Sequence, residues 1–336
     1  MIMDVKILII IVLIFIIGYQ SNRHFIEIYK RLKSFFSVSR KKGNDLIKMP
    51  KTFEIKKYID RCIKKDLSQL VKHESLKALC EYSTEDGKRI RSVILLSLLK
   101  RKNPVIEKYG IDSILFIEYL HASSLIMDDI MDHDLMRRNQ LCVYKKYGYT
   151  MAQLTAMQLM AMSFVKISQM IRNIHNSLAT RIDKNELTIW ILDNITNNFQ
   201  DLCFGQFLDL NGHKNQIRSL IEKKTVTLFE ISFVLGWVLS GETLSEINSI
   251  KKLGNLFGLI FQIADDFEDY DKDNNQNSQN NYVIANGREA SYKHFQTYKN
   301  DFVNMSDQLG VLTPEIVEII SYLEMKIKQS LQIISS

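Results

Sequence analysis

Proline is scarce in this chain of 336 residues and occurs only at Pro50, Pro104 and Pro314. Glycine is also uncommon, with 13 residues. Because these two residue types most often end or interrupt helices, their scarcity predicts an all-α protein. Four stretches are too apolar for surface helices and are predicted to be buried central ones: residues 93–99, 114–126, 154–167 and 256–263.

Cysteine is sparse as well. The four cysteines are scattered along the chain, which does not suggest a disulfide framework and is typical of a reducing compartment. The sequence has no Gly-rich phosphate loop, no zinc-ligand spacing and no internal repeat. It also has no segment typical of an interdomain linker, so residues 49–336 are predicted to form one helical domain.

The positive charge is confined to one end of the chain. The formal net charge is +6, and the first 48 residues contain nine Lys and Arg but only three Asp and Glu. The remaining chain is therefore neutral overall. A nucleic-acid-binding domain would be expected to carry a basic footprint, so the sequence argues against a nucleic-acid partner.

Eleven consecutive apolar residues, 7–17, lie within this basic segment. They cover only about half of a ~30 Å hydrocarbon core, but the flanking residues lengthen the segment if Lys6 reaches the interface. We therefore expect a membrane anchor over residues 1–20 and a basic juxtamembrane linker over residues 21–48, with the folded domain in the cytosol. A cleaved signal peptide is the alternative, although the basic residues follow the apolar run and no small-residue cleavage site is evident.

The most informative feature that is present is a pair of acidic clusters with the same pattern, Asp-Asp-x-x-Asp, each within an apolar helical stretch. The clusters are Asp128, Asp129 and Asp132, and then Asp265, Asp266 and Asp269. The first and last aspartates of each cluster are four residues apart and share a helix face, where their repulsion costs about 0.2–0.5 kcal/mol per pair. A bound cation would offset this repulsion.

The residue types predict which cation. Carboxylate oxygens without supporting His or Cys suit Mg²⁺, which completes its shell with substrate phosphates. The clusters are therefore predicted to form two halves of one magnesium site for diphosphate chemistry. The principal ligands are expected to be Asp128, Asp132 and Asp265, with Asp129, Asp266 and Asp269 completing the site through water or hydrogen bonds. The alternative for either cluster alone is a solvated helix face.

Further motifs accompany the clusters in a fixed order. They are DGKRIRS (86–92), YLHASSLIMDDIMDHDLMRR (119–138), FGQFLDL (204–210), KKTVTLF (223–229) and GLIFQIADDFED (258–269). Together they resemble the trans-isoprenyl diphosphate synthases, which elongate prenyl chains head to tail. The resemblance implies a bundle of long helices around a deep cavity, with the two acidic clusters facing each other at its mouth. It also implies a homodimer and three Mg²⁺ ions per site when diphosphate is bound.

The resemblance also implies roles for individual residues. The expected binding residues for isopentenyl diphosphate are Lys88, Arg91, His121 and Arg138. Arg137 would hold the allylic diphosphate, because a planar guanidinium meets phosphate oxygens in pairs. Lys224 and Thr225 would approach the reacting carbons and the diphosphate, and Gln262 the carbocation, with Gln206 and Asp209 nearby. The implied catalytic set is Asp128, Asp129, Asp132, Arg137, Lys224, Thr225, Gln262 and Asp265.

Product length is expected to depend on the helical turn before the first cluster. In the family, bulky aromatic residues four or five positions before the first aspartate stop chain growth early, and here those positions hold Ser124 and Ser123. Small side chains predict a product beyond farnesyl length, namely geranylgeranyl diphosphate or a somewhat longer chain. Met157, Met160 and Met162 are predicted to line the lower cavity, since thioethers conform to an extended tail, or to be plain core.

Some positions depart from the family pattern. Asn139 replaces a frequent Gly, and Gln279 aligns near a loop lysine that normally holds the metal-bound diphosphate. A farnesyl diphosphate synthase, a noncatalytic membrane-localised subunit and a class I terpene cyclase remain alternatives. A membrane anchor in front of such a domain resembles the arrangement in relatives from large DNA viruses. The expected location is therefore the endoplasmic reticulum or a viral host membrane.

Overall fold

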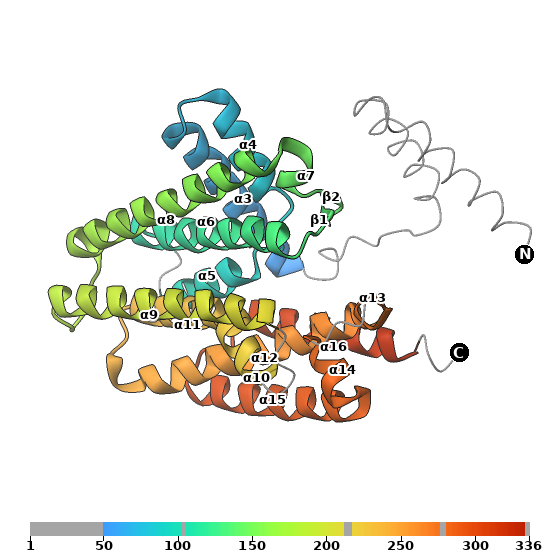
Figure 1. The fold of residues 1–336 in the computed structure, drawn as a ribbon. Helices are drawn as coiled ribbons and strands as arrows, with labels where there is room; N and C mark the ends of the chain where they lie inside the picture. The colour runs from blue at the N-terminus through green and yellow to red at the C-terminus, as the bar shows by residue number, and fades with distance from the viewer. Residues whose placement is uncertain (1–49, 103–104, 212–216, 276–279, 333–336) are drawn as a thin grey trace, which may run out of the picture. The chain divides into compact units, whose positions relative to one another are not determined.

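The computed structural model describes residues 50–102, 105–211, 217–275 and 280–332. The predicted anchor and linker, residues 1–48, lie outside these ranges. The compact unit that contains the described helices runs from Met49 to Ser336. Apart from one two-stranded hairpin, the described residues form helices and loops, which confirms the predicted all-α class (Figure 1).

The elements follow one another along the chain with short connections. The helices of the first half are α3 (Pro50–Leu70), α4 (Glu74–Thr84), α5 (Ile90–Lys102), α6 (Lys108–Met131), α7 (Val143–Tyr147) and α8 (Tyr149–Ser177), and the hairpin is β1 (Met136–Arg137) with β2 (Gln140–Leu141). Those of the second half are α9 (Lys184–Asn211), α10 (Ile217–Ile221), the π-helical turn η4 (Glu222–Val226), α11 (Thr227–Val238), the 3₁₀ turn η5 (Leu244–Glu246), α12 (Ile247–Glu268), α13 (Tyr270–Asn275), α14 (Tyr282–Asn286), α15 (Arg288–Gln308) and α16 (Pro314–Gln332). Two of the three prolines, Pro50 and Pro314, begin helices, where the missing N–H costs nothing.

The core is built around α6, α11 and α12. Helix α6 packs along α8, and α11 packs against α5 and α12. A cluster of buried aromatic rings joins α11, α12 and α15, with centroids 5.1 Å apart for Phe229 and Phe257 and 5.5 Å apart for Phe257 and Phe302. The predicted burial of 93–99, 114–126 and 256–263 is therefore confirmed, apart from partly exposed side chains on α6.

Helix α8 does not fit the prediction of a fully buried helix. One side is buried, but Leu154, Phe164 and Val165 are exposed, and Met157 is 70% exposed. Helices α6 and α8 are both long and apolar enough to cross a membrane, yet α6 owes its composition to the core that it occupies. The prediction for 154–167 was wrong because an apolar stretch does not say whether its second face meets this chain or something else.

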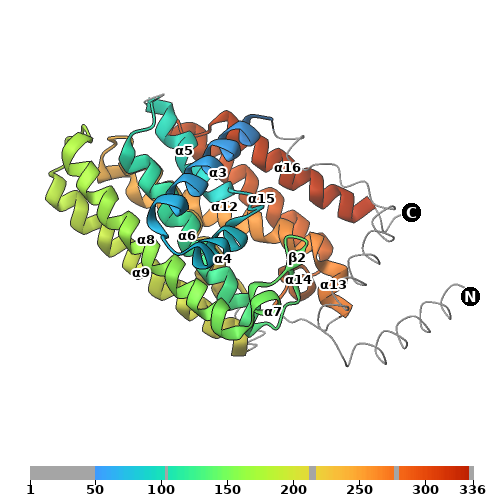
Figure 2. The same cartoon turned by 90° about the horizontal axis from the view of Figure 1, so that it is seen from above.

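The two acidic clusters lie at the carboxyl-terminal ends of α6 and α12. The hairpin, α13 and α14 gather at one end of the bundle in both views (Figures 1 and 2). The long helices therefore act as a rigid frame, and the charged groups sit at their ends and in the short elements that follow them.

Candidate active site

The first acidic cluster closes α6. Asp128 is half-buried, whereas Asp132 is exposed and caps the helix, with its backbone N–H donating to the Asp128 carbonyl at 2.8 Å. Asp129, between them, is 3% exposed and accepts a hydrogen bond from Arg137 Nε at 2.5 Å. Burial is the main cause that raises the pKa of Asp128, to about 6, although Lys224 opposes it. Asp128 and Asp132 thus share the open face, and Asp129 is bound within the protein.

The second cluster closes α12 in the same way. Asp265 is half-buried, and the exposed Asp269 caps the helix with its N–H on the Asp265 carbonyl at 3.0 Å. Asp266 is 6% exposed and accepts hydrogen bonds from Gln262 Nε2 and from the Tyr282 backbone N–H, both at 2.7 Å. Burial raises the pKa of Asp266 to about 7 in spite of these donors.

Each cluster has one lysine at the same distance. Lys224 Nζ lies 3.7 Å from Asp128 Oδ2, and Lys88 Nζ lies 3.7 Å from Asp265 Oδ1. Within the described ranges, no group of three or more His, Cys, Asp or Glu side chains converges on a point that could hold a metal ion. The first aspartates therefore each face a single ammonium group, and a metal held there would need further oxygen ligands from outside the protein.

The π turn η4 connects the two sides. It places Lys224 beside Asp128, and the next residue, Thr225, donates from Oγ1 to Gln262 Oε1 on α12 at 2.7 Å. Helix α9 can lie against this turn because it has Gly205 there, where a Cβ atom would come within 2.5 Å of the Lys224 backbone nitrogen. Short π segments within helices often occur at functional sites.

A second group of side chains near the acidic clusters is positive. Arg91 and His121 face each other, with Nη1 and Nε2 3.4 Å apart, and the Arg91 guanidinium stacks over the Phe229 ring at 4.3 Å. Among the described residues Arg91 forms no ion pair, and its Nε has no hydrogen-bond partner. Burial lowers the pKa of Arg91 to about 10 and that of Arg138 also to about 10.

His121 shares this environment. Burial lowers the pKa of His121 well below its usual range, and the neighbouring guanidinium groups, Arg91 first, lower it further. The three groups therefore form a half-buried positive pocket, and none of them makes an ion pair with a carboxylate among the described residues. Such a pocket is suited to an anion with several oxygens.

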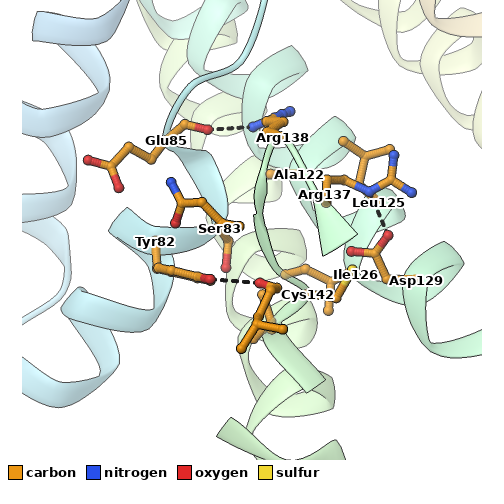
Figure 3. A pocket seen from close by; sticks show the side chains of 13 residues that line it. Tyr82, Ser83, Glu85, Ala122, Leu125, Ile126, Asp129, Arg137, Arg138 and Cys142 are labelled. Carbon is orange, nitrogen blue, oxygen red and sulfur yellow. Dashed lines mark hydrogen bonds and ion pairs between the residues drawn. The ribbon is translucent and has the colours of Figure 1, made fainter. Parts of the chain in front are cut away.

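The hairpin positions the second pair of arginines. Its turn has Arg138 and Asn139 at φ 50° and 63°, a left-handed conformation that Asn adopts more readily than most residues. Figure 3 shows how the hairpin is attached: Tyr82 Oη donates to the Leu141 carbonyl at 2.6 Å, and Arg138 Nη1 donates to the Glu85 carbonyl at 2.8 Å. On its other side, Arg137 reaches Asp129 on α6.

Of the two predicted chain-length residues, Ser123 is buried between α6 and α8, and Ser124 is half-buried. Ser123 is 1% exposed and its Oγ donates to the Ala156 carbonyl of α8 at 2.9 Å, whereas Ser124 bonds to the His121 carbonyl of its own helix. Met162 is buried and Met160 is half-buried. Met157 is exposed, so its predicted place in the wall of a cavity within this chain is wrong.

Sequence reasoning assigned no role to several residues that position the site. Tyr82 and Glu85 hold the hairpin, and Asn280 donates to Asp209 Oδ1 at 2.5 Å. Glu85 immediately precedes the first basic motif and Tyr82 lies four residues before it, which is a usable signal, but Asn280 lies in a run of polar residues without any distinguishing pattern. Gln279, where the family lysine was expected, lies outside the described residues.

Comparison with known proteins extends these observations. The profile of the polyprenyl synthetase family matches residues 73–283. A trans-prenyltransferase of African swine fever virus (isolate Pig/Kenya/KEN-50/1950) is 30% identical over 222 residues, which are 63% of this chain and 64% of the relative. A short chain isoprenyl diphosphate synthase of Methanothermobacter thermautotrophicus is 30% identical over 217 residues, 62% of each chain. The chain therefore spans just under two thirds of the length of the viral relative.

Solved structures share the fold. A geranyltranstransferase of Thermotoga maritima superposes with a TM-score of 0.68 at 21% identity, over 83% of this chain and 99% of that one. A geranyltransferase of Legionella pneumophila gives a TM-score of 0.69 at 17% identity, over 86% and 99% of the two chains. The matched segment contains both acidic clusters, the positive pocket and the π turn, and this chain belongs to the polyprenyl synthetase family.

Proposed function

We propose that this protein is a Mg²⁺-dependent trans-prenyltransferase that condenses isopentenyl diphosphate with allylic diphosphates. The observation that carries the proposal is that acidic and positive groups lie near one another around the π turn η4. On one side are the two acidic clusters, in which Asp128 lies 3.7 Å from Lys224 and Asp265 lies 3.7 Å from Lys88. On the other is a half-buried positive pocket of Arg91, His121 and Arg138, which form no ion pair with a carboxylate among the described residues.

The acidic clusters fit Mg²⁺. Their free ligands are hard carboxylate oxygens, half-buried at Asp128 and Asp265 and exposed at Asp132 and Asp269, which would hold the ions. When bound, Mg²⁺ would neutralise the oxygens of the departing allylic diphosphate. Asp129 would serve differently, by holding Arg137 at the site where the allylic diphosphate arrives.

The remaining residues bind and orient the substrates. Arg91, His121 and Arg138 would hold the diphosphate of isopentenyl diphosphate, supported by Lys88. Lys224 would face the allylic diphosphate, and the Thr225 to Gln262 hydrogen bond would fix the amide beside the carbocation. Because the aromatic ring of Phe229 covers Arg91, water is kept from one face of that guanidinium and its attraction for diphosphate is strengthened.

The decisive experiment is one set of incubations. Purified protein, Mg²⁺ and labelled isopentenyl diphosphate are combined with dimethylallyl, geranyl or farnesyl diphosphate, and the products are sized by chromatography. We expect elongation with at least one primer and none with EDTA. Failure to elongate any primer, with intact folding shown by circular dichroism, would refute the proposal and favour a noncatalytic subunit.

We propose geranylgeranyl diphosphate, or a somewhat longer chain, as the product. The support is that Ser123, at the α6 to α8 contact, is small and buried. Ser123→Phe should shorten the product, and Ser124→Phe is the companion variant. An unchanged product spectrum in both would place the length-determining floor elsewhere.

We further propose that the protein is a homodimer through the exposed apolar side chains of α8 and α9. Met157 and Phe164 on α8, and Ile189 and Phe207 on α9, are large, apolar and exposed, and a second copy of this chain would cover them. Light scattering should give twice the mass of one chain, and Phe164→Asp should reduce it to that of a monomer. A monomeric wild type would refute the dimer.

Residues 1–20 are proposed as a membrane anchor on the basis of the apolar run 7–17 alone. Removing residues 1–45 should release the protein from the membrane fraction into the cytosol. A truncated protein that still pellets with membranes would refute this part of the proposal.

A further inference from the structure

Three consecutive residues span the distance between the two halves of the site. Asn280 Nδ2 donates to Asp209 on α9, at 3.0 Å to the backbone carbonyl and 2.5 Å to Oδ1. The next residue, Asn281, donates from Nδ2 to the Asp266 carbonyl on α12 at 2.9 Å, and the backbone N–H of Tyr282 donates to Asp266 Oδ2 at 2.7 Å. We call residues 280–282 the strap. It ties α9 to the second acidic cluster.

The other oxygen of Asp209 leads to the first acidic cluster. Asp209 Oδ2 accepts a hydrogen bond from Lys224 Nζ, and the same ammonium group lies 3.7 Å from Asp128 Oδ2. The carboxylate of Asp209 is therefore held at both oxygens, by a neutral amide on one side and by the ammonium group on the other. Fixing one oxygen fixes the orientation of the other, and with it the place of the ammonium group.

We propose that Asn280 is a positioning residue that orients Asp209 so that the Lys224 ammonium group stays at Asp128, where the allylic diphosphate is bound. This inference rests on the proposed function and deepens it. A neutral donor suits the task because it leaves the negative charge of Asp209 for Lys224. A lysine at the same position would compete with Lys224 for that charge.

The anchoring of the strap supports the assignment. Asn281 is buried and its Oδ1 accepts from the backbone N–H groups of Val283 and Ile284 at 2.9 and 3.1 Å, while its amide also reaches Asp273 at 2.9 Å. Tyr282 is buried as well. Because the two residues that follow it are fixed in this way, the two bonds from Asn280 to Asp209 cost less conformational entropy.

The test in the absence of any ligand is amine labelling. The protein is treated briefly with acetic anhydride, and the acetylation of Lys224 and of the adjacent Lys223 is quantified by mass spectrometry. Lys223 pairs with Asp201, outside the proposed arrangement, and is the internal control. We expect Asn280→Ala to raise labelling of Lys224 several-fold with Lys223 unchanged. Equal labelling of Lys224 in wild type and variant would overturn the inference, whether or not the protein is an enzyme.

The test in the working enzyme is a double-mutant cycle. Asn280→Ala should lower kcat by about tenfold, as expected for losing a hydrogen bond to a charged group, while KM for isopentenyl diphosphate stays within about twofold. In an Asp209→Ala background the same change should have less than about a twofold effect, because Asn280 acts through Asp209. Fully additive effects would overturn the inference.

Two further variants separate positioning from folding. Asn286→Ala is the matched control, since Asn286 donates only to the Tyr282 carbonyl one helical turn away, and kcat should not change. Asn280→Asp keeps the size but replaces the donor by a carboxylate facing Asp209, so its kcat should fall below that of Asn280→Ala. If the kcat of Asn280→Asp equals that of the wild type, Asn280 does not act as a hydrogen-bond donor to Asp209. A wild type that makes no product would refute the proposed function, leaving the labelling experiment to decide this inference.

Discussion

The two acidic clusters share one arrangement although they lie on helices far apart in sequence. In each, the first aspartate is half-buried with a lysine 3.7 Å away, and the last is exposed and caps its helix. The middle aspartate of each is buried and bound within the protein, Asp129 to Arg137 and Asp266 to Gln262 and Tyr282. The pattern therefore encodes two functions, ligands at its ends and a structural contact in its middle.

The difference between the clusters lies in what holds the middle aspartate. Asp129 is paired with a charged guanidinium, whereas Asp266 has only neutral donors. Burial raises the pKa of both, to about 7 for Asp266, and Arg137 opposes the rise at Asp129. The first cluster thus shares its middle charge with Arg137, the residue proposed to bind the allylic diphosphate, and the second uses its middle charge to hold the strap.

The largest expected effect comes from the first aspartates. Asp128→Asn and Asp265→Asn should each lower kcat by about 10²–10⁴, because each removes a charge that, in the proposed function, would bind the metal–diphosphate group. Each should change the thermal midpoint of the metal-free protein little, since the loss of the lysine contact at 3.7 Å is offset by relief of the repulsion between carboxylates. Steady-state kinetics and scanning calorimetry check both statements. A variant that keeps near-normal turnover would break the proposed equivalence of the clusters.

Two arginines of one motif, Arg89 and Arg91, differ in the same way, because one is paired with carboxylates and the other is not. Arg89 forms ion pairs with Asp60 at 2.8 Å and with the buried Glu118 at 2.7 Å, whereas Arg91 forms none among the described residues. Arg91→Ala should raise KM for isopentenyl diphosphate about 100-fold without loss of stability. Arg89→Ala should instead cost about 3–5 kcal/mol in urea unfolding by leaving Glu118 unpaired. The reverse result would contradict this division.

The middle aspartates sharpen the difference between the clusters. Asp129→Asn should cost about 2 kcal/mol of unfolding free energy and raise KM for the allylic substrate, because Arg137 loses the nearer of its two carboxylate partners and keeps only Asp134 at 3.5 Å. Asp266→Asn should cost less than about 1 kcal/mol, since an amide oxygen still accepts from Tyr282 and no cation is left unpaired. Paired urea titrations of the metal-free proteins measure both values. Equal losses would mean that Arg137 does not depend on Asp129.

The smallest expected effect concerns pH. The pKa of His121 is lowered in the folded protein, so the unfolded state binds more protons below its usual value of about 6.5. Stability should therefore fall as pH decreases from about 6.5, and His121→Asn should remove that part of the slope. Urea midpoints at pH 7.5 and 5.5 give the comparison. Identical slopes in the two proteins would show that Arg91, Arg137 and Arg138 do not keep this imidazole neutral.

The sequence predicted the residues that carry charge better than the residues that hold them. Helical spacing was enough to place Asp128 with Asp132 and Asp265 with Asp269. It could not assign Asp129 to Arg137, because that contact depends on a left-handed turn at Arg138 and Asn139 that returns the chain to α6. Nor could it identify Asn280, since neighbouring asparagines are chemically identical and only tertiary contacts distinguish them.

Burial was predicted correctly where both faces of a helix meet this chain. For α8 the apolar pattern was the same, but Met157 and Phe164 are exposed. Hydrophobicity predicts that a surface is covered and does not say by what. The π turn was not predicted either. A single extra residue in a helical turn does not change the recognisable pattern of a short segment such as Lys223, Lys224 and Thr225.

Because of the π turn, the chain should tolerate substitutions around residues 222–226 better than insertions or deletions. Each residue of an α-helix advances by about 100°, so removing one residue between Glu222 and Val226 would leave the turn one residue short and change which of its side chains face α9 and α12. Lys224 or Thr225 would then leave its partner even though neither had been replaced. Natural variants of this protein should therefore accept many substitutions around the turn but no insertion or deletion within it.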